Sequence, residues 1–242
     1  MTILAIDAGN TRIKWGLYAN GHWLAQGWTA TAQPHLDSQL GKLPAPEKII
    51  VSNVAGSHAA LAIENMCNAW KSAPYIVHAR ADQCGVSSCY AAPQQLGSDR
   101  WAALIAAHYL YMERDVLVVQ IGTAVTIDTL AADGRFQGGL ILPGLNLMLD
   151  TLTRNTAGLA PQLGKFAALP DNTADAMFSG AVNAIAGAVE RSYRKLANSP
   201  ICLLSGGDVD ILLPLLNIPA QIADNLVLEG LLRIALEPEK EK

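Results

Sequence analysis

The sequence contains an internal repeat, and this repeat constrains the fold more than any other feature. Ile3–Thr11 (ILAIDAGNT) and Val116–Ala124 (VLVVQIGTA) each consist of an apolar run, a polar residue and a glycine turn. The shift that aligns these two segments also places Asn20-Gly21 on Asp133-Gly134 without a gap. Both dipeptides are strong hairpin signals, because Asn and Asp tolerate a positive φ and Gly favours it. Each copy therefore predicts a strand, a glycine turn, a second strand, a hairpin turn and a third strand.

The repeat predicts an α/β protein of two duplicated halves, with residues 1–114 as the N-terminal domain and residues 115–242 as the C-terminal domain. Strands that alternate with helices are typical of this fold class. Two β-meanders that look alike by chance remain the alternative. Ser57 and Thr173 are expected to cap their helices. The pattern predicts strands at His22–Thr29, Lys48–Val54, Tyr75–His78, Arg135–Leu142 and Ile201–Leu204, and helices at Ser57–Lys71, Ser98–Glu113, Thr173–Ala197 and Asn225–Leu236.

Composition and charge exclude several classes of protein. A chain with 51% hydrophobic and 16% charged residues is too apolar to be disordered. The formal net charge is −4 and Lys and Arg do not cluster, which argues against a nucleic-acid partner. No apolar run reaches the ~18 residues of a membrane helix, and the first residues, MTILAID, lack the basic segment of a signal peptide. We therefore expect a cytoplasmic protein that binds no membrane, with its four cysteines reduced.

The first glycine turn, Asp7–Thr11, has the residues of a phosphate-binding hairpin. Gly9 allows the backbone to approach a ligand closely, and successive N–H groups can form an anion-binding nest. Arg12 and Lys14 are expected on one face of the next strand, because side chains alternate along a strand. The carboxylate of Asp7 would suit Mg²⁺ or its bound waters beside a phosphate. A plain β-turn containing Gly and Asn is the alternative.

The second glycine turn repeats this arrangement with one difference. Thr123 can donate a hydrogen bond to a phosphate oxygen, but Gln120 stands where the first copy has Asp7. Two such turns facing one cleft would hold the phosphates of a nucleotide from both sides. Gly206-Gly207 ends a later strand and would let a base or ribose lie against the backbone, although a simple strand-to-helix turn explains it equally well.

The segment Gly97–Arg100 (GSDR) opens a predicted helix and offers a catalytic carboxylate. Asp99 lies in the first turn, where the helix dipole favours its ionised form. An ionised carboxylate there can accept a proton from a substrate hydroxyl, and Arg100 can bind a carboxylate through two hydrogen bonds. The alternative is that Asp99 is an ordinary acidic residue in the first turn of a helix, with no catalytic role.

Small residues form a stripe along the predicted helix that begins at Thr173. They are Ala176, Gly180, Ala184 and Gly187. Core packing and a dimer seam both explain such a stripe.

Five segments taken together resemble the type III pantothenate kinases. They occur in the order of that family and run nearly from end to end of the chain: DAGNT (Asp7–Thr11), YAAPQQLGSDRW (Tyr90–Trp101), GTAVTID (Gly122–Asp128), ADGRFQGGLILPG (Ala132–Gly144) and LVLEGL (Leu226–Leu231). The resemblance implies two duplicated ribonuclease-H-like domains with mixed sheets flanked by helices, the actin-like ATPase fold. It also implies phosphorylation of pantothenate by ATP, the first step of coenzyme A biosynthesis. Mg²⁺, a monovalent cation such as K⁺ or NH₄⁺, and a homodimer are further implications.

The resemblance also assigns roles to single residues. Asp99 matches the general base on the pantothenate hydroxyl, and Thr173 matches a pantothenate contact made from the partner subunit. Asp7 is expected to position Mg²⁺ through water. The other pantothenate-binding positions are Tyr90, Gly97, Ser98 and Arg100. The ATP-binding positions are Asp7, Ala8, Gly9, Asn10, Thr11, Arg12, Ile13, Lys14, Thr123, Gly206 and Gly207.

One position departs from the family pattern. The family has Asp before the second glycine turn as a ligand of the monovalent cation, and this chain has Gln120. A neutral amide oxygen is a weaker cation ligand than a carboxylate, which leads to the hypothesis that the cation requirement is altered or weakened. Two other functions stay open from sequence alone: an idle ATP-binding regulatory module, and a kinase for another small hydroxylated substrate.

Overall fold

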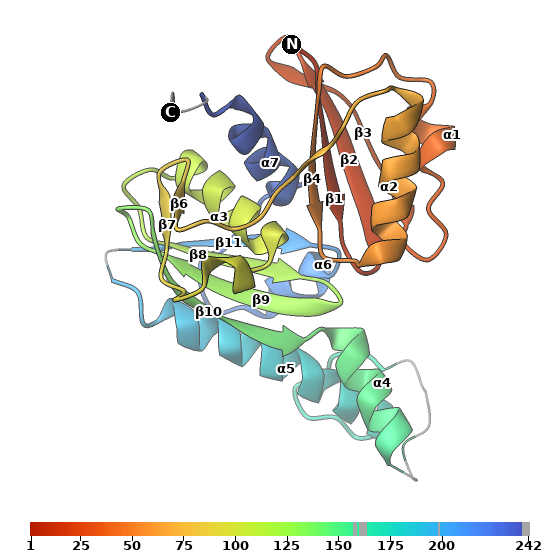
Figure 1. Cartoon of the computed structure of the whole chain (residues 1–242). Coiled ribbons are helices and arrows are strands. Elements are labelled where there is room, and N and C mark those ends of the chain that lie inside the picture. The colour runs from red at the N-terminus through yellow and green to blue at the C-terminus, as the bar shows by residue number, and fades with distance from the viewer. Residues whose placement is uncertain (157–158, 160–163, 198, 239–242) are drawn as a thin grey trace. The chain divides into compact units, whose positions relative to one another are not determined.

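The computed structural model describes residues 1–156, 159, 164–197 and 199–238 (Figure 1). The chain forms two compact units. The first comprises Met1–Met112, Gly134–Phe136 and the chain from Asn225 onward, and the second comprises Glu113–Asp133 and Gln137–Asp224. The division after Met112 lies close to the boundary expected at residue 114. The C-terminal segment groups with the first unit, whereas the sequence prediction places it in the second half; the duplicated halves themselves stay a prediction.

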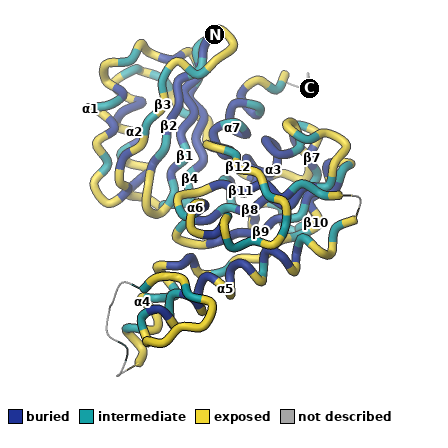
Figure 2. The backbone as a smooth tube through the Cα atoms, turned by 180° about the vertical axis from the view of Figure 1, so that it is seen from behind, coloured by how far each residue is buried: buried dark blue, intermediate teal, exposed yellow. Residues whose placement is uncertain are grey.

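The first unit is built on a five-stranded sheet with the order β3-β2-β1-β4-β5. Its strands are β1 (Ile3–Ala8), β2 (Arg12–Ala19), β3 (His22–Ala30), β4 (Lys48–Asn53) and β5 (Tyr75–Ile76). β1 pairs antiparallel with β2 and parallel with β4. Alternate residues of β1, including Leu4 and Ile6, enter one core cluster. The central strands are accordingly buried in Figure 2.

Helices lie on both faces of this sheet (Figure 1). α1 (Leu36–Leu40) and α2 (Ser57–Ala69) contribute buried residues to the cluster around Leu4 and Ile6. α7 (Leu226–Leu236) packs on β1 and β4, and α3 (Ser98–Leu110) packs on α7. A Cβ atom at Gly230 of α7 would overlap the backbone of Ala102 in α3, so glycine permits this close approach. A short 3₁₀ turn, η1 (Pro93–Gln95), precedes α3.

The second unit contains the strands β12-β11-β8-β9-β10 in that order. Their bounds are β8 (Val116–Ile121), β9 (Ala124–Leu130), β10 (Arg135–Pro143), β11 (Ile201–Gly206) and β12 (Gln221–Ile222). The helical elements are α4 (Leu145–Asn155), α5 (Thr173–Tyr193), α6 (Val209–Leu212) and η2 (Leu213–Leu215). Two short strands of the first unit, β6 (Asp82–Gln83) and β7 (Val86–Ser88), extend the sheet, because β7 pairs with the beginning of β10.

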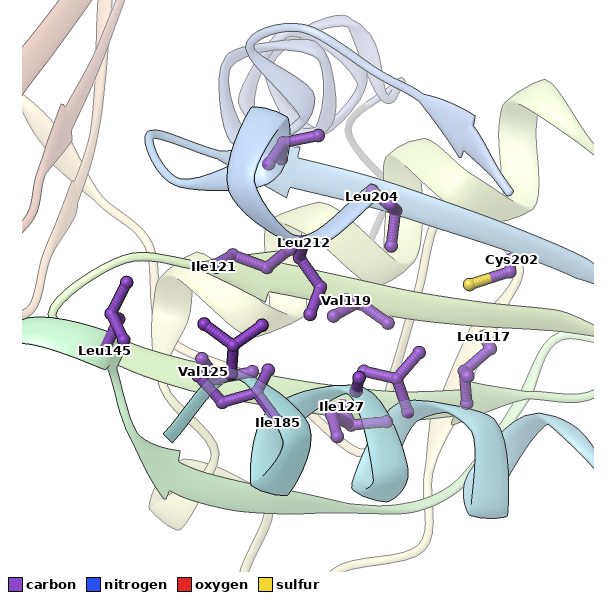
Figure 3. Packing of buried hydrophobic residues seen from close by; sticks show 14 of the residues in the cluster. Leu117, Val119, Ile121, Val125, Ile127, Leu145, Ile185, Cys202, Leu204 and Leu212 are labelled. Carbon is purple, nitrogen blue, oxygen red and sulfur yellow. The ribbon is translucent and has the colours of Figure 1, made fainter. Parts of the chain in front are cut away.

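One face of β8, β9 and β11 forms the core of the second unit against α5. Figure 3 shows Val119, Val125 and Ile127 directed toward Ile185 of that helix. The opposite face of the same strands carries Gln120, Thr126 and Ser205, since side chains alternate along a strand. These three polar residues form one row across the strands on a face that also carries the buried Val118 and Leu203.

The repeat is present in both units, but its two turns differ in length. The N–H of Gly9 donates to the carbonyl of Arg12, whereas the N–H of Gly122 donates to that of Ala124. The first turn is therefore one residue longer. The next connection compensates, because Ala19 and His22 pair directly across Asn20-Gly21 while β9 and β10 are joined by residues 131–134. The ungapped alignment of the sequence holds because the second turn and β9 are each one residue shorter than their counterparts in the first copy, while the connection after β9 is two residues longer.

Two capping predictions are wrong. α2 begins at Ser57, but its N-cap residue is Gly56. α5 begins at Thr173, but the side chain of Asn172 accepts the hydrogen bond from the Asp175 N–H and caps the helix. Asn is as good an N-cap residue as Ser or Thr, so composition alone cannot choose between neighbouring candidates.

Two further observations concern surfaces. The small-residue stripe of α5 (Ala176, Gly180, Ala184 and Gly187) is exposed in the single chain, which rules out core packing within it. Among the described residues, no helix is both long and apolar enough to span a membrane.

Candidate active site

The first glycine turn is fixed by a residue from the end of the third strand. The hydroxyl of Thr31 donates to the carbonyl of Gly9 at 2.7 Å, and the Thr31 N–H donates to the carbonyl of Thr11 at 3.0 Å. Thr31 itself is buried. Asn10 and Thr11 stay exposed at the tip of the turn. Two hydrogen bonds thus hold the turn in place while its polar tip faces outward.

Asp7 lies at the end of β1, opposite Lys14 of β2. Its Oδ1 atom is buried and has no hydrogen-bond partner among the described residues. Burial, the largest cause, and the negative charge of Asp99 together raise the pKa of Asp7 to about 7, and Lys14 opposes the rise. The two residues are linked through the fold, because Asp7 is in register with Ser52, whose Oγ lies 2.8 Å from Oγ of Ser98, the residue before Asp99. An unpaired buried carboxylate oxygen beside a second carboxylate is an arrangement that a divalent cation would stabilise.

Asp99 is the second residue of α3, and its carboxylate turns back over the start of the helix. Its Oδ1 accepts a hydrogen bond from the Arg100 N–H at 2.8 Å. A Cβ atom at Gly97 would lie 2.5 Å from this Oδ1, so a larger residue would displace the carboxylate. Burial raises the pKa of Asp99, and Arg100 opposes the rise. A carboxylate with a raised pKa is suited to general base chemistry near neutral pH.

Tyr90 and Arg100 meet around an aromatic ring that the sequence reasoning missed. The ring centroids of Tyr90 and Phe136 are 5.5 Å apart, and Cζ of Arg100 lies 6.0 Å from the centroid of Phe136. Arg100 is only 4% exposed. Phe136 lies inside Ala132–Gly144, one of the five segments that resemble the family. An aromatic residue within such a segment was the signal that could have identified it.

Ser98, at the first position of α3, is engaged with the sheet of the first unit. Its Oγ lies 2.8 Å from Oγ of Ser52 in β4, and both side chains are buried. The predicted contact between Ser98 and pantothenate stays a prediction. Ser52 was not singled out by sequence reasoning, because a serine within an apolar strand carries no signal of its own.

In the second unit, the glycine turn lies at the carboxyl ends of two parallel strands. The N–H of Gly144 donates to the carbonyl of Thr123 at 2.9 Å, and a Cβ atom at Gly144 would overlap the carbonyl of Gly122. Gly206 has a φ of +117°, and a Cβ atom there would overlap the backbone of Ile121. The predicted residues Thr123 and Gly206 therefore belong to one edge of this sheet, the edge at which open α/β sheets bind ligands.

Gln120 lies in β8, where it is opposite Thr126 of β9 and beside Ser205 of β11. The Nε2 atom of Gln120 and the Oγ1 atom of Thr126 are buried with no hydrogen-bond partner among the described residues. The repeat-equivalent positions Asp7 and Gln120 thus both carry an unpaired polar atom. In the first unit that atom is an acceptor, and in the second it is a donor.

Comparison with known proteins identifies the family. Residues 3–195 match the family model described as type III pantothenate kinase. The chain belongs to this family. It is 45% identical over 240 residues to the type III pantothenate kinase of Nitrosospira multiformis, covering 97% of this chain and 91% of that protein. It is 48% identical over 238 residues to that of Aromatoleum aromaticum, covering 97% and 98%.

The fold has relatives outside the family as well. The activator of the 2-hydroxyisocaproyl-CoA dehydratase from Clostridium difficile, solved with bound ADPNP, is similar with a TM-score of 0.55 and 13% identity, covering 98% of this chain and 93% of the activator. Such likeness shows the fold alone. It confirms the predicted α/β class with two sheets flanked by helices, the actin-like ATPase and sugar kinase fold.

Family membership confirms the predicted activity. The protein is a kinase that phosphorylates pantothenate with ATP in coenzyme A biosynthesis. Within the first unit, the structure pairs Asp7 with Lys14 and ties the start of α3, next to Asp99, to Ser52 beside Asp7. It also gathers Tyr90 and Arg100 around Phe136. Thr173 is exposed at the start of α5, and its contact with a partner subunit stays a prediction.

Proposed function

We propose that Asp99 is the general base of this kinase and that the first glycine turn binds phosphate oxygens of ATP. Asp99 takes the proton of the pantothenate hydroxyl. The hydroxyl oxygen then forms a bond to the γ-phosphorus, and the bond between that phosphorus and its bridging oxygen breaks to release ADP. Phosphoryl transfer of this kind depends mainly on positioning and charge stabilisation. The observation that carries the proposal is the placement of Asp99 at the start of α3, next to Ser98, whose hydroxyl contacts the Ser52 that stands in register with Asp7.

The remaining roles follow the chemistry of each side chain. We propose that Asn10, Thr11 and Lys14 bind phosphate oxygens, together with Arg12 and the backbone of Ala8, Gly9 and Ile13. Thr123 binds a phosphate oxygen from the second turn, and Gly206 and Gly207 let the nucleoside lie against the backbone. Arg100 binds the carboxylate of pantothenate beside Tyr90. The near-complete burial of Arg100 supports this role, because a buried guanidinium discriminates well for a carboxylate.

A divalent metal fits the first unit. Asp7 offers a buried carboxylate oxygen with no partner among the described residues, and the nearby Asp99 adds negative charge. We propose that Asp7 would hold Mg²⁺, directly or through its waters. The ion, when bound with ATP, supplies charge neutralisation to the phosphates.

The monovalent cation fits the second unit less well. K⁺ and NH₄⁺ differ in chemistry, but each is bound by oxygen atoms. Gln120 offers a neutral amide at this position, and an amide oxygen is a weaker cation ligand than a carboxylate. We propose that turnover depends weakly on K⁺ or NH₄⁺.

The cation proposal is tested by comparing rates in K⁺, in NH₄⁺ and in a bulky organic cation. The wild type is expected to differ by less than about 3-fold, whereas Gln120→Asp should gain dependence on K⁺, because a carboxylate is the stronger ligand. Thermal melting with and without K⁺ gives a readout independent of turnover. An ordinary, strong K⁺ dependence of the wild type contradicts the proposal.

We also propose a cytoplasmic homodimer in which Thr173 reaches the pantothenate site of the partner subunit. The exposed small-residue stripe of α5 supports it. So do the exposed apolar side chains on β10 and on α4, which packs against α5. These side chains are Leu140, Ile141, Leu147 and Leu152.

The role of Asp99 is tested with Asp99→Asn. The variant should bind ATP as the wild type does, while kcat falls by roughly 10²–10⁴-fold, the usual contribution of a general base. Asp37→Asn is a matched control, because Asp37 also lies in the first turn of a helix of this unit but is exposed. An unchanged kcat in Asp99→Asn would remove Asp99 from the base role.

A further inference from the structure

Ser52 occupies the strand position beside Asp7. In the parallel pair of β1 and β4, Asp7 is in register with Ser52. Residues in register on neighbouring strands direct their side chains to the same face of the sheet. Val51, which precedes Ser52 in β4, and Ile49, which shares the face of Val51, enter the core cluster on the opposite face. Ser52 therefore stands on the Asp7 face, and it is 0% exposed.

The hydroxyl of Ser52 also reaches the start of the helix that carries Asp99. Its Oγ lies 2.8 Å from Oγ of Ser98, the residue that precedes Asp99 in the chain. The N-cap residue of α3 is Gly97, and it makes no side-chain capping hydrogen bond. One side-chain hydrogen bond thus connects the strand position next to Asp7 with the first residue of α3.

This hydrogen bond joins the strand residue beside Asp7 to the helix residue before Asp99. On one side it is anchored in the central strands of the sheet, where the backbone is fully buried and paired. On the other side it holds a helix end that has no side-chain cap. A change at this hydrogen bond would therefore move Asp99 relative to Asp7 more easily than it would move β4.

We infer that Ser52 is a positioning residue, which holds Ser98 and so sets the placement of the Asp99 carboxylate relative to Asp7 and the phosphate turn. The inference rests on the roles proposed for Asp7 and Asp99. Ser52 itself touches neither substrate nor phosphate in this account. It acts through Ser98, and its effect is on the geometry of the attacking hydroxyl and its base, to which rates are very sensitive.

Ser52→Ala tests the inference. We expect kcat to fall by roughly 10–100-fold, because a displacement of about 1 Å in a reacting group can cost ~10²-fold. The KM for ATP should change by less than about 3-fold, since the phosphate turn is held separately by Thr31. Ser98→Ala removes the same hydrogen bond from the helix side and should reproduce the loss. The double variant should have about the same kcat as either single variant, because each of the three variants lacks the same Ser52–Ser98 hydrogen bond.

Gln83→Leu is the matched control. The side chain of Gln83 accepts a buried hydrogen bond from Trp101 Nε1, which lies on the same helix α3. Its loss removes a buried side-chain partner from this helix, as Ser52→Ala does, but leaves the Ser52–Ser98 hydrogen bond in place. This variant should melt at a lower temperature and keep kcat within about 3-fold of the wild type. The split between stability and kcat separates positioning from simple structural support.

The outcomes separate this inference from the proposed function when Asp99→Asn is assayed in parallel. A loss of kcat in Asp99→Asn and in both serine variants, with Gln83→Leu active, supports the inference. A loss in Asp99→Asn with kcat retained in Ser52→Ala overturns the inference alone. If Asp99→Asn keeps full activity, the proposed role of Asp99 is wrong, and the role of Ser52 is overturned with it.

Discussion

Asp7 shows how one buried atom can link stability to function. Its Oδ1 has no partner among the described residues, and burial together with Asp99 raises its pKa to about 7. Such an unpaired group is costly to the folded state. A cation bound at this carboxylate would offset the cost, because a bound Mg²⁺ would favour the ionised form. The sequence could identify Asp7 by its repeat position, but not its unpaired oxygen, which depends on the packing around it.

The raised pKa of Asp7 predicts how the stability of the ligand-free protein changes with pH. Below about pH 4 the carboxyl is protonated in both the folded and the unfolded chain. As the pH rises toward 7, the unfolded chain ionises first, so the free energy of unfolding falls. Above about pH 7 the carboxyl is ionised in both states and the loss is complete. Asp7→Asn should therefore be more stable than the wild type at pH 8 and nearly equal to it at pH 4.

Denaturant unfolding of both proteins at a series of pH values, without Mg²⁺ and ATP, measures this difference. Parallel stability curves for the wild type and Asp7→Asn from pH 4 to pH 8 would show that the Asp7 carboxyl carries no such penalty.

Among the elements, those defined by strong local signals were predictable and those defined by tertiary contacts were not. The hairpins followed from Asn20-Gly21 and Asp133-Gly134, and both Gly21 and Gly134 have a positive φ. The helix α4 was missed, because Leu145–Asn155 has no clear N-cap residue and its N-cap position is Gly144. The shorter second turn was also missed, since the longer connection after β9 makes up for a shorter turn and a shorter strand and leaves no gap in the alignment.

The close packing of α7 on α3 leads to a prediction at this scale. Gly230→Ala should destabilise the protein by about 1–3 kcal/mol or more, because the added Cβ would overlap the backbone of Ala102. Ala60→Gly on the exposed side of α2 is the matched control. It exchanges the same two residues in a helix without a packing clash, so it should cost no more than about 1 kcal/mol, the helix propensity of Ala over Gly. Thermal or denaturant unfolding measures both variants, and equal stabilities would contradict the packing account.

At the scale of the whole molecule, the repeat predicted two sheets but not the membership of the C-terminal segment. α7 follows the second unit in the sequence and belongs to the first. Its partners are Trp23, whose Nε1 donates to Glu229 at 2.6 Å, and Lys48, whose Nζ donates to the carbonyl of Ala235. Hydrogen bonds between residues so distant in the chain leave no trace in local sequence patterns.

The proposed homodimer is tested by a bulky charge on the exposed stripe of α5. Gly180→Arg should shift the protein from dimer to monomer in sedimentation and lower its activity with pantothenate, because Thr173 would lose the partner site. Ala60→Arg on the exposed side of α2 is the control and should remain dimeric. A wild type that sediments as a monomer at assay concentrations would refute the dimer, and a dimeric Gly180→Arg would place its interface elsewhere.

The most direct measurement is ADP release by the purified wild type with Mg·ATP, measured with and without pantothenate in the presence of K⁺ or NH₄⁺. The account predicts turnover that depends on pantothenate and is absent with other small hydroxylated acceptors. A folded sample that binds ATP but releases no ADP on addition of pantothenate would contradict it.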